Sequence, residues 1–188
     1  MSGLALFTGL RRDRSGVAAV EFALVVPLLL TMWLGMEQVS EYATADAKTL
    51  MAAQSVSDLI SQLPASDSGT FTDIADAATQ IMAPLATTGK ITVDVVGVTY
   101  TTPTTPATGW RCTSTGGPAA DATVPLSLAN NLGSATQMAV MVNVKYTFQP
   151  AMTFGLLGSA IINAIGAQTL SERAFSQPRL VSQLAKPC

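Results

Sequence analysis

The sequence predicts an α+β fold in which one long helix near the N-terminus precedes a small antiparallel sheet. Residues 17–36 form an apolar run, and apolar residues continue at helical spacing from there to Leu63. The pattern then changes, because residues 90–101 and 138–148 alternate in the manner of strands and are rich in β-branched side chains. A helix followed by a series of strands is typical of α+β domains.

The beginning of the long helix combines a basic cluster, a glycine and an acidic residue within an apolar run. Arginines precede Gly16, and Glu21 is the charged residue inside the run. A carboxylate in a membrane segment is costly, so an acid retained there is usually functional. Cleavage after Gly16 would make Val17 the new N-terminus. The new amine and the Glu21 carboxylate would then lie on the first turn of one helix. A negative charge at that end also interacts favourably with the helix dipole. The arginines predict that the N-terminus stays in the cytoplasm and that the rest of the chain lies outside it.

Two simpler hypotheses exist for this segment. The run at 17–36 is longer than the apolar core of about 7–15 residues found in a secretory signal peptide. An uncleaved signal anchor would explain the basic flank and the apolar run. It would not explain why Glu21 is tolerated or why Gly16 stands at the boundary.

The second half of the helix is amphipathic, so we expect it to pack on the sheet. Its predicted polar stripe consists of residues seven apart, namely Glu41, Lys48, Ser55 and Gln62. Its predicted buried face consists of Leu50, Val56, Leu59, Ile60 and Leu63 with Ala43, Ala47, Ala52 and Ala53. Pro64 cannot continue the helix and predicts its end.

The remaining elements are short. We expect a linker at 64–70 and a helix from Ile74 to Leu85, with Thr72 or Asp73 as its N-cap. Four strands are expected, at 90–101, around Trp110 to Cys112, at 138–148 and near Ala167 to Phe175. Loops are expected at 102–109 and 113–136.

Residues 146–171 carry no charge. Glycine, serine and asparagine interrupt this stretch, which argues against a second membrane span of about 20 apolar residues. We expect a buried or partner-facing loop or helix.

Composition favours a structural role over catalysis. The chain has no histidine, which removes the commonest general base and metal ligand. No phosphate-binding or nucleophile motif is present, so we predict no catalytic residue, cofactor or metal, and no nucleic-acid partner. Charged residues are 12% of the chain, which favours a membrane-anchored exported protein. In an oxidising compartment Cys112 and Cys188 are expected to form one intrachain disulfide, with two free thiols as the alternative.

Residues 14–30 read Arg-Ser-Gly-Val-Ala-Ala-Val-Glu-Phe-Ala-Leu-Val-Val-Pro-Leu-Leu-Leu. They resemble the processing site of type IV pilins and pseudopilins, and are most similar to the TadE/TadG-like minor pseudopilins of tight-adherence (Flp-type) pilus systems. The close resemblance covers residues 11–36. The rest of the chain is similar to the family in layout alone.

The resemblance implies a processed, membrane-anchored assembly protein. A prepilin peptidase would remove a leader at 1–16 by cutting between Gly16 and Val17, leaving a membrane span at 17–36 and an extracytoplasmic domain at 37–188. Glu21 and Phe22 would act in assembly, with Glu21 pairing with the N-terminal amine of a neighbouring subunit.

The implied function is the assembly, initiation or capping of the pilus, without enzymatic activity. The implied partners are prepilin peptidase, other pilins and pseudopilins, and the inner-membrane assembly platform. The protein would be a single-pass inner-membrane protein with a periplasmic domain, or would be incorporated in the pilus. The alternative is a signal-anchored periplasmic binding or adhesion domain that is neither cleaved nor polymerised.

Overall fold

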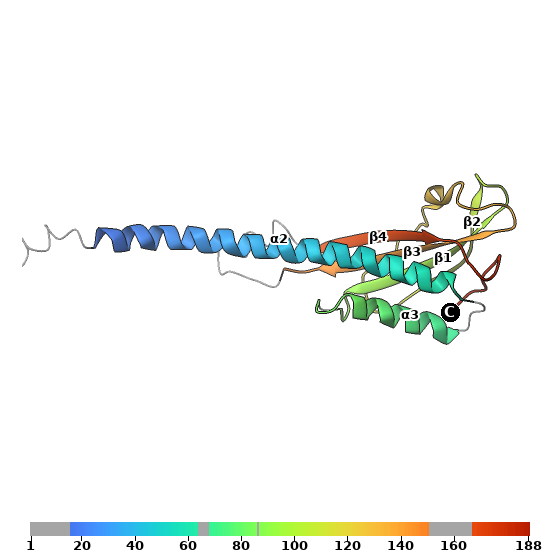
Figure 1. The fold of residues 1–188 in the computed structure, drawn as a ribbon, viewed down its shortest axis with the longest axis horizontal. Coiled ribbons are helices and arrows are strands. Elements are labelled where there is room, and N and C mark those ends of the chain that lie inside the picture. Colours follow the sequence, from blue (N-terminus) through green and yellow to red (C-terminus); the bar gives the residue numbers. More distant parts are fainter. Residues whose placement is uncertain (1–15, 64–67, 86, 151–166) are drawn as a thin grey trace, which may run out of the picture. The chain divides into compact units, whose positions relative to one another are not determined.

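The computed structural model describes residues 16–63, 68–85, 87–150 and 167–188 (Figure 1). The chain divides into two compact units, residues 1–41 and 42–188. The described part of the first unit is the beginning of helix α2 (Val17–Ser61). The second unit holds the rest of α2, helix α3 (Ser68–Ile81) and a four-stranded antiparallel sheet. The α+β class predicted from the sequence is confirmed.

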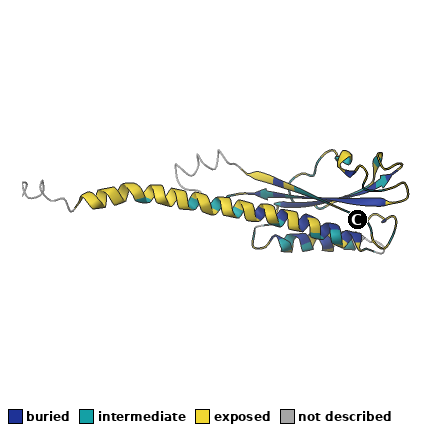
Figure 2. Ribbon diagram, turned by 45° about the horizontal axis from the view of Figure 1, so that its top comes forward, coloured by how far each residue is buried: buried dark blue, intermediate teal, exposed yellow. Residues whose placement is uncertain are grey.

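The first part of α2 is apolar around its circumference. Figure 2 shows this stretch as mostly exposed, and large side chains such as Phe22, Leu24 and Met32 are at least 70% exposed. A helix that is hydrophobic on every side needs a non-aqueous environment. Among the described residues, α2 is the one helix that is long and apolar enough to cross a membrane, judged by its length and composition.

The sheet has the strand order β2-β1-β3-β4, and every neighbouring pair is antiparallel. Its strands are β1 (Ile91–Tyr100), β2 (Pro106–Thr113), β3 (Met138–Phe148) and β4 (Gln168–Ser176). The two strands with the clearest alternation became the central pair. Both are buried over almost their whole length, because both faces of the sheet are covered.

Strand β2 is longer than the sequence predicted. The expected loop at 102–109 was wrong for residues 106–109, which belong to β2, and residues 106–108 pair with Tyr100 to Val98 of β1. Proline and glycine disfavour strands, and these residues obscured the signal. Pairing with β1 overrides this preference, and a register shift between Gly97 and Val98 accommodates the irregular sequence.

Small side chains place α2 against the sheet. Buried residues of α2 are mostly small alanine, serine and threonine residues, with Val56 and Ile60 as the larger members. They share one apolar core with residues of β1, β3 and α3. The predicted buried face was therefore partly wrong, because Leu50 and Leu59 are 39% and 41% exposed. Ala43 and Ala47 are exposed as well. The buried face of α2 consists mostly of small residues, which share the core with larger residues of the strands.

Helix α3 begins earlier than predicted. Thr72 and Asp73 lie inside it, so neither is its N-cap, and residues 68–70 of the expected linker are helical. Phe71 accounts for the shift, because it is buried and extends the apolar spacing of Ile74, Ala75 and Ala78 by one turn. The helix ends at Ile81, before Pro84, rather than at Leu85.

The second face of the sheet is covered by the connection between β2 and β3. This connection contains a short 3₁₀ helix, η1 (Leu126–Ala129). The Tyr100 hydroxyl donates a hydrogen bond to the Ala129 carbonyl at 2.8 Å. Ala129 also joins a small second core with Val98 and Met141.

A C-terminal tail follows β4 and crosses the end of the sheet. The backbone N–H of Arg179 donates to the carbonyl of Ser61 at the end of α2, at 2.8 Å. The N–H of Met138, at the start of β3, donates to Ser182 at 3.1 Å. The tail thus contacts the helix and a central strand before it reaches β2.

Two contacts fix the end of this tail to β2. Trp110 Nε1 donates to the Leu184 carbonyl at 2.9 Å, and the Leu184 side chain is buried in the main core. Cys112 and Cys188 form the predicted disulfide, with their Cα atoms 5.9 Å apart. The tail is consequently part of the folded unit. The apolar residues 151–166, for which a buried or partner-facing segment was expected, lie outside the described residues.

Replacing Cys188 by serine should lower the stability of the second unit. The disulfide joins residues 76 apart, and closing a loop of that length stabilises by about 4 kcal/mol in the chain-entropy model. The measurement is urea unfolding of the full chain, followed by tryptophan fluorescence with Trp33 replaced by phenylalanine so that Trp110 alone reports. Reduced wild-type protein should unfold at the same urea concentration as the variant. An unchanged midpoint in both samples would show that the bridge does not stabilise the fold.

Candidate functional site

The peptide bond between Gly16 and Val17 lies at the boundary of α2. Val17 is the first helical residue, and the N–H of Val20 donates to the carbonyl of Gly16 at 3.2 Å. Gly16 is exposed, and no atom lies within 4 Å of the position that a Cβ would occupy there. The bond is therefore exposed, and its carbonyl accepts a hydrogen bond from the first turn of the helix.

Glu21 lies one turn beyond Val17 on the same side of α2. Glu21 is exposed, and no ion-pair partner for it is found in residues 16–63. Phe22, the next residue, is 70% exposed. The start of α2 therefore presents a carboxylate and a large aromatic side chain to whatever surrounds the helix. If the Gly16–Val17 bond were cut, the new amine would stand on the side of the helix that carries Glu21.

A second group of polar residues lies across the sheet of the 42–188 unit. The strand register places Thr113, Asp94, Asn143 and Arg173 opposite one another, one from each strand. Asp94 is 4% exposed and accepts two hydrogen bonds from Arg111, each 2.8 Å long. Such bidentate pairs are among the strongest charge-assisted contacts. The hydrogen bond that Arg111 donates to the Asp94 carboxylate is the main cause of the raised pKa of Arg111.

Asp121 lies in the connection between β2 and β3, and it links this connection to the polar row on the sheet. Its carboxylate accepts hydrogen bonds from Lys145 at 2.7 Å, Arg173 at 3.0 Å and Asn143 at 3.1 Å. Its backbone carbonyl accepts one from Arg111 at 2.7 Å. The hydrogen bonds from Lys145 and Arg173 lower the pKa of Asp121. The side chain of Asp121 thereby attaches the covering segment to β3 and β4, and its backbone carbonyl attaches it to β2 through Arg111.

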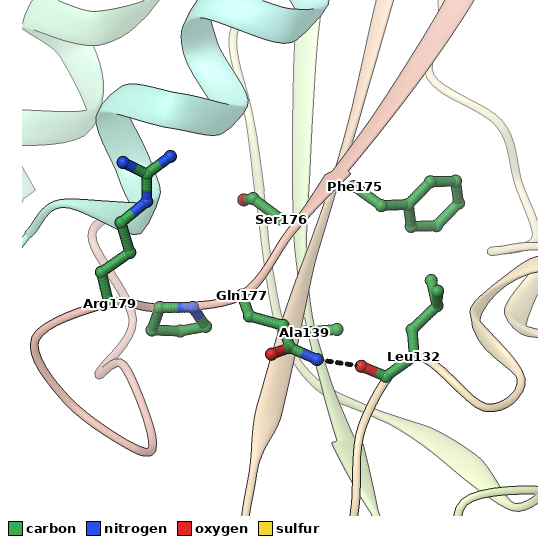
Figure 3. A pocket seen from close by; sticks show the side chains of 7 residues that line it. Leu132, Ala139, Phe175, Ser176, Gln177 and Arg179 are labelled. Atoms are coloured by element: carbon green, nitrogen blue, oxygen red, sulfur yellow. Dashed lines mark hydrogen bonds between the residues drawn. The ribbon is translucent and has the colours of Figure 1, made fainter.

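This polar group serves the fold rather than catalysis. Its charged side chains are paired with one another, and the described part of the chain holds no cluster of acids and cysteines suited to a metal ion. An open hollow of about 540 Å³ lies elsewhere, around the end of β4. Figure 3 shows Phe175 and Leu132 on one side of this hollow and Arg179 on the other.

The family model described as "TadE-like protein" matches residues 16–56. Residues 16–56 are TadE-like. The matched segment begins at Gly16 and includes Glu21 and most of α2, so it confirms the TadE-like resemblance over this part of the chain. Proteins of this TadE-like family are generally not enzymes. No curated protein and no solved structure matches the chain.

The structure places the predicted site residues in two groups. Gly16, Val17, Glu21 and Phe22 lie at the start of α2, and the disulfide joins Cys112 to Cys188. The Asp121 network was not predicted. Its one sequence signal was the position of charged residues inside β-branched strands, as at Asp94 and Lys145. The partner of those residues comes from a loop, and no local pattern identifies it.

Replacing Asp121 by asparagine should loosen the connection that covers the sheet. Losing the charge on a carboxylate with two cationic partners should cost about 1–3 kcal/mol. Hydrogen exchange at residues 114–136 should accelerate, while exchange in β1 and β3 changes less. Asp73→Asn is the control, since Asp73 is exposed on α3.

The same variant should change the dependence of stability on pH. The pKa of Asp121 is lower in the folded state than the ordinary value of about 4 in the unfolded chain. The stability from this carboxylate is therefore present above about pH 4 and is lost as pH falls through the folded pKa. Wild-type protein should lose stability there more steeply than Asp121→Asn. Identical slopes for the two proteins would contradict this role for Asp121.

Proposed function

We propose that the protein is a minor pseudopilin that acts in the assembly, initiation or capping of a tight-adherence (Flp-type) pilus. The observation that carries this proposal is the TadE-like match, which begins at the glycine preceding α2. The exposed apolar surface at the start of α2 supports it, because such a surface is stable in a membrane or in a bundle of similar helices.

The proposed mature chain begins at Val17. Residues 1–16 form the leader, 17–36 the membrane span and 37–188 the extracytoplasmic domain. The span rises about 30 Å as an α-helix, which matches the hydrocarbon core of a bilayer. Prepilin peptidase removes the leader on the cytoplasmic side of the inner membrane, and the domain stands in the periplasm or becomes part of the pilus.

In the proposed mechanism Glu21 directs assembly. An unpaired carboxylate in an apolar environment is unfavourable, and so is the new amine of Val17. Pairing Glu21 with the amine of an adjacent pilin or pseudopilin compensates both charges at low dielectric constant. This pairing is satisfied at one axial offset between neighbouring helices, so it sets their stagger on the assembly platform. Phe22 packs beside it on the same surface.

Cleavage at the proposed bond is tested by mass spectrometry of the chain from cells with an active prepilin peptidase. The mature N-terminus should be Val17, and Gly16→Phe should leave a longer precursor in the membrane because the bulky side chain obstructs the bond. Wild-type chain from cells with inactive peptidase should match this precursor. Recovery of intact wild-type chain from cells with active peptidase would contradict processing.

The role of Glu21 is tested by comparing Glu21→Gln with Glu37→Gln. Removing the charge at Glu21 should leave membrane insertion unchanged or improved, because the segment becomes more apolar. Pilus yield should nevertheless fall by about tenfold or more, since leaving one charge of a desolvated pair uncompensated costs a few kcal/mol. Glu37 follows the proposed span, so its variant should assemble normally.

Membrane levels and pilus yield are measured in the same cells. Normal piliation by Glu21→Gln would refute the assembly role and would favour a signal-anchored binding or adhesion domain. Loss of the protein from the membrane would likewise contradict the mechanism.

A further inference from the structure

Strand β4 lies at one edge of the sheet, and its register shows which backbone groups face outward. The N–H of Thr147 donates to the carbonyl of Lys90 at 2.8 Å, so the backbone of Thr147 points toward β1. Backbone groups in an antiparallel strand point alternately to either side. Even-numbered residues of β3 therefore point toward β4, where they meet even-numbered residues. The outward groups belong to Thr169, Ser171, Arg173 and Phe175.

Within the described residues, the outward backbone groups of Thr169, Ser171, Arg173 and Phe175 bond to no segment of the chain. The strand is nine residues long, contains no proline and pairs with β3 without a register shift. A long and regular edge of this kind is a template for pairing with another chain.

The opposite edge of the sheet is protected. Strand β2 begins at Pro106, and its pairing with β1 is interrupted at Gly97 and Val98. The disulfide at Cys112 also holds the C-terminal tail against β2. Irregular pairing, proline and covering segments are the usual devices that prevent edge-to-edge association. Their concentration at β2 leaves β4 as the edge open to pairing.

The hollow at the end of β4 provides a place for a side chain of an added strand. Leu132, Ala139 and Phe175 contribute its apolar lining (Figure 3). Gln177 Nε2 donates a hydrogen bond to the Leu132 carbonyl, which connects the loop before β3 to the end of β4. Strand addition takes its affinity from main-chain hydrogen bonds and its specificity from such hollows for individual side chains.

The charges on β4 favour a strand from a different protein over a second copy. Complete antiparallel overlap of two β4 strands would place Glu172 opposite Glu172, and directly opposed like charges are destabilising. A different chain can avoid this repulsion by placing a basic or neutral residue there.

We propose that β4 is a docking edge that accepts an extended strand from the extracytoplasmic domain of another pseudopilin of the same system. The added strand continues the sheet to five strands and places an apolar side chain in the hollow beside Phe175. The identity of the partner rests on the proposed function, whereas the open edge and the hollow are properties of this domain.

The test uses hydrogen exchange of the full chain in detergent, alone and mixed with each of the other full-length pseudopilins of the system. In the complex, the amides of Thr169, Ser171, Arg173 and Phe175 should exchange at least about tenfold more slowly, which corresponds to about 1.4 kcal/mol. The even-numbered amides of β4 should change little, because they already bond to β3.

Ser171→Pro and Ser171→Ala form a matched pair. Both remove the hydroxyl that donates to Asn143 Oδ1 at 3.0 Å. Only proline also removes the outward N–H, which β3 does not use. Ser171→Pro should weaken binding by about tenfold or more relative to Ser171→Ala. Thr169→Pro and Thr169→Ala replace this pair if proline at 171 accelerates exchange of the even-numbered amides.

Several results would overturn the inference. The proline and alanine variants could bind equally well, the outward amides could already be as protected as the even-numbered ones in the isolated chain, or no pseudopilin could bind the wild-type chain. Each of these leaves the cleavage and Glu21 experiments unaffected, so failure of the docking edge is distinguishable from failure of the proposed function. Protection of β4 by self-association alone would also refute it, in favour of a second copy.

Discussion

The fold of the 42–188 unit depends on the close packing of one face of α2 against the sheet. That face carries alanine and other small residues, with Val56 and Ile60 as its larger members. The larger residues of β1 and β3 fill the core that these small side chains share with the sheet. Interiors pack at the density of organic crystals, and a bulkier side chain at Ala52 or Ala53 would force the helix away. The same helix includes the TadE-like segment, so this packing joins the sheet to the element that carries the proposed anchor.

The two faces of the sheet are held by different physical interactions. One face is apolar and packs on the helices, whereas the other combines a small apolar core with a row of charged residues. Charged groups near the interior are stable if they are paired and hydrogen-bonded, and Asp121 meets this condition with Lys145 and Arg173. The network gives a loop that lacks long regular structure a defined position on the sheet. It also closes the second face, which explains why β1 and β3 are buried on both sides.

The two edges of the sheet are also unequal, and this inequality connects the fold to assembly. The disulfide, the tail and an irregular register protect β2, while β4 presents a regular row of outward backbone groups. A minor pseudopilin has to contact several different subunits. In the proposed arrangement, the start of α2 supplies one contact through Glu21 and β4 supplies another through backbone pairing. These contacts use different chemistry, since one is a charge pair in an apolar environment and the other is a set of hydrogen bonds at a sheet edge.

The sequence by itself determined the elements whose signal is local. The period of apolar residues identified the long helix, the two central strands and the α+β class, and the motif from Gly16 to Phe22 identified the TadE-like segment before any tertiary information. The presence of two cysteines sufficed to predict the disulfide. Tertiary structure decided which face of α2 is buried, because leucine and alanine are both apolar and only the distance to the sheet selects between them. It also decided the start of β2, the pairing of Asp94 with Asn143, and the contacts of Asp121 with residues of the sheet. These features depend on strand register and on contacts between residues far apart in the chain, and local periodicity does not encode either.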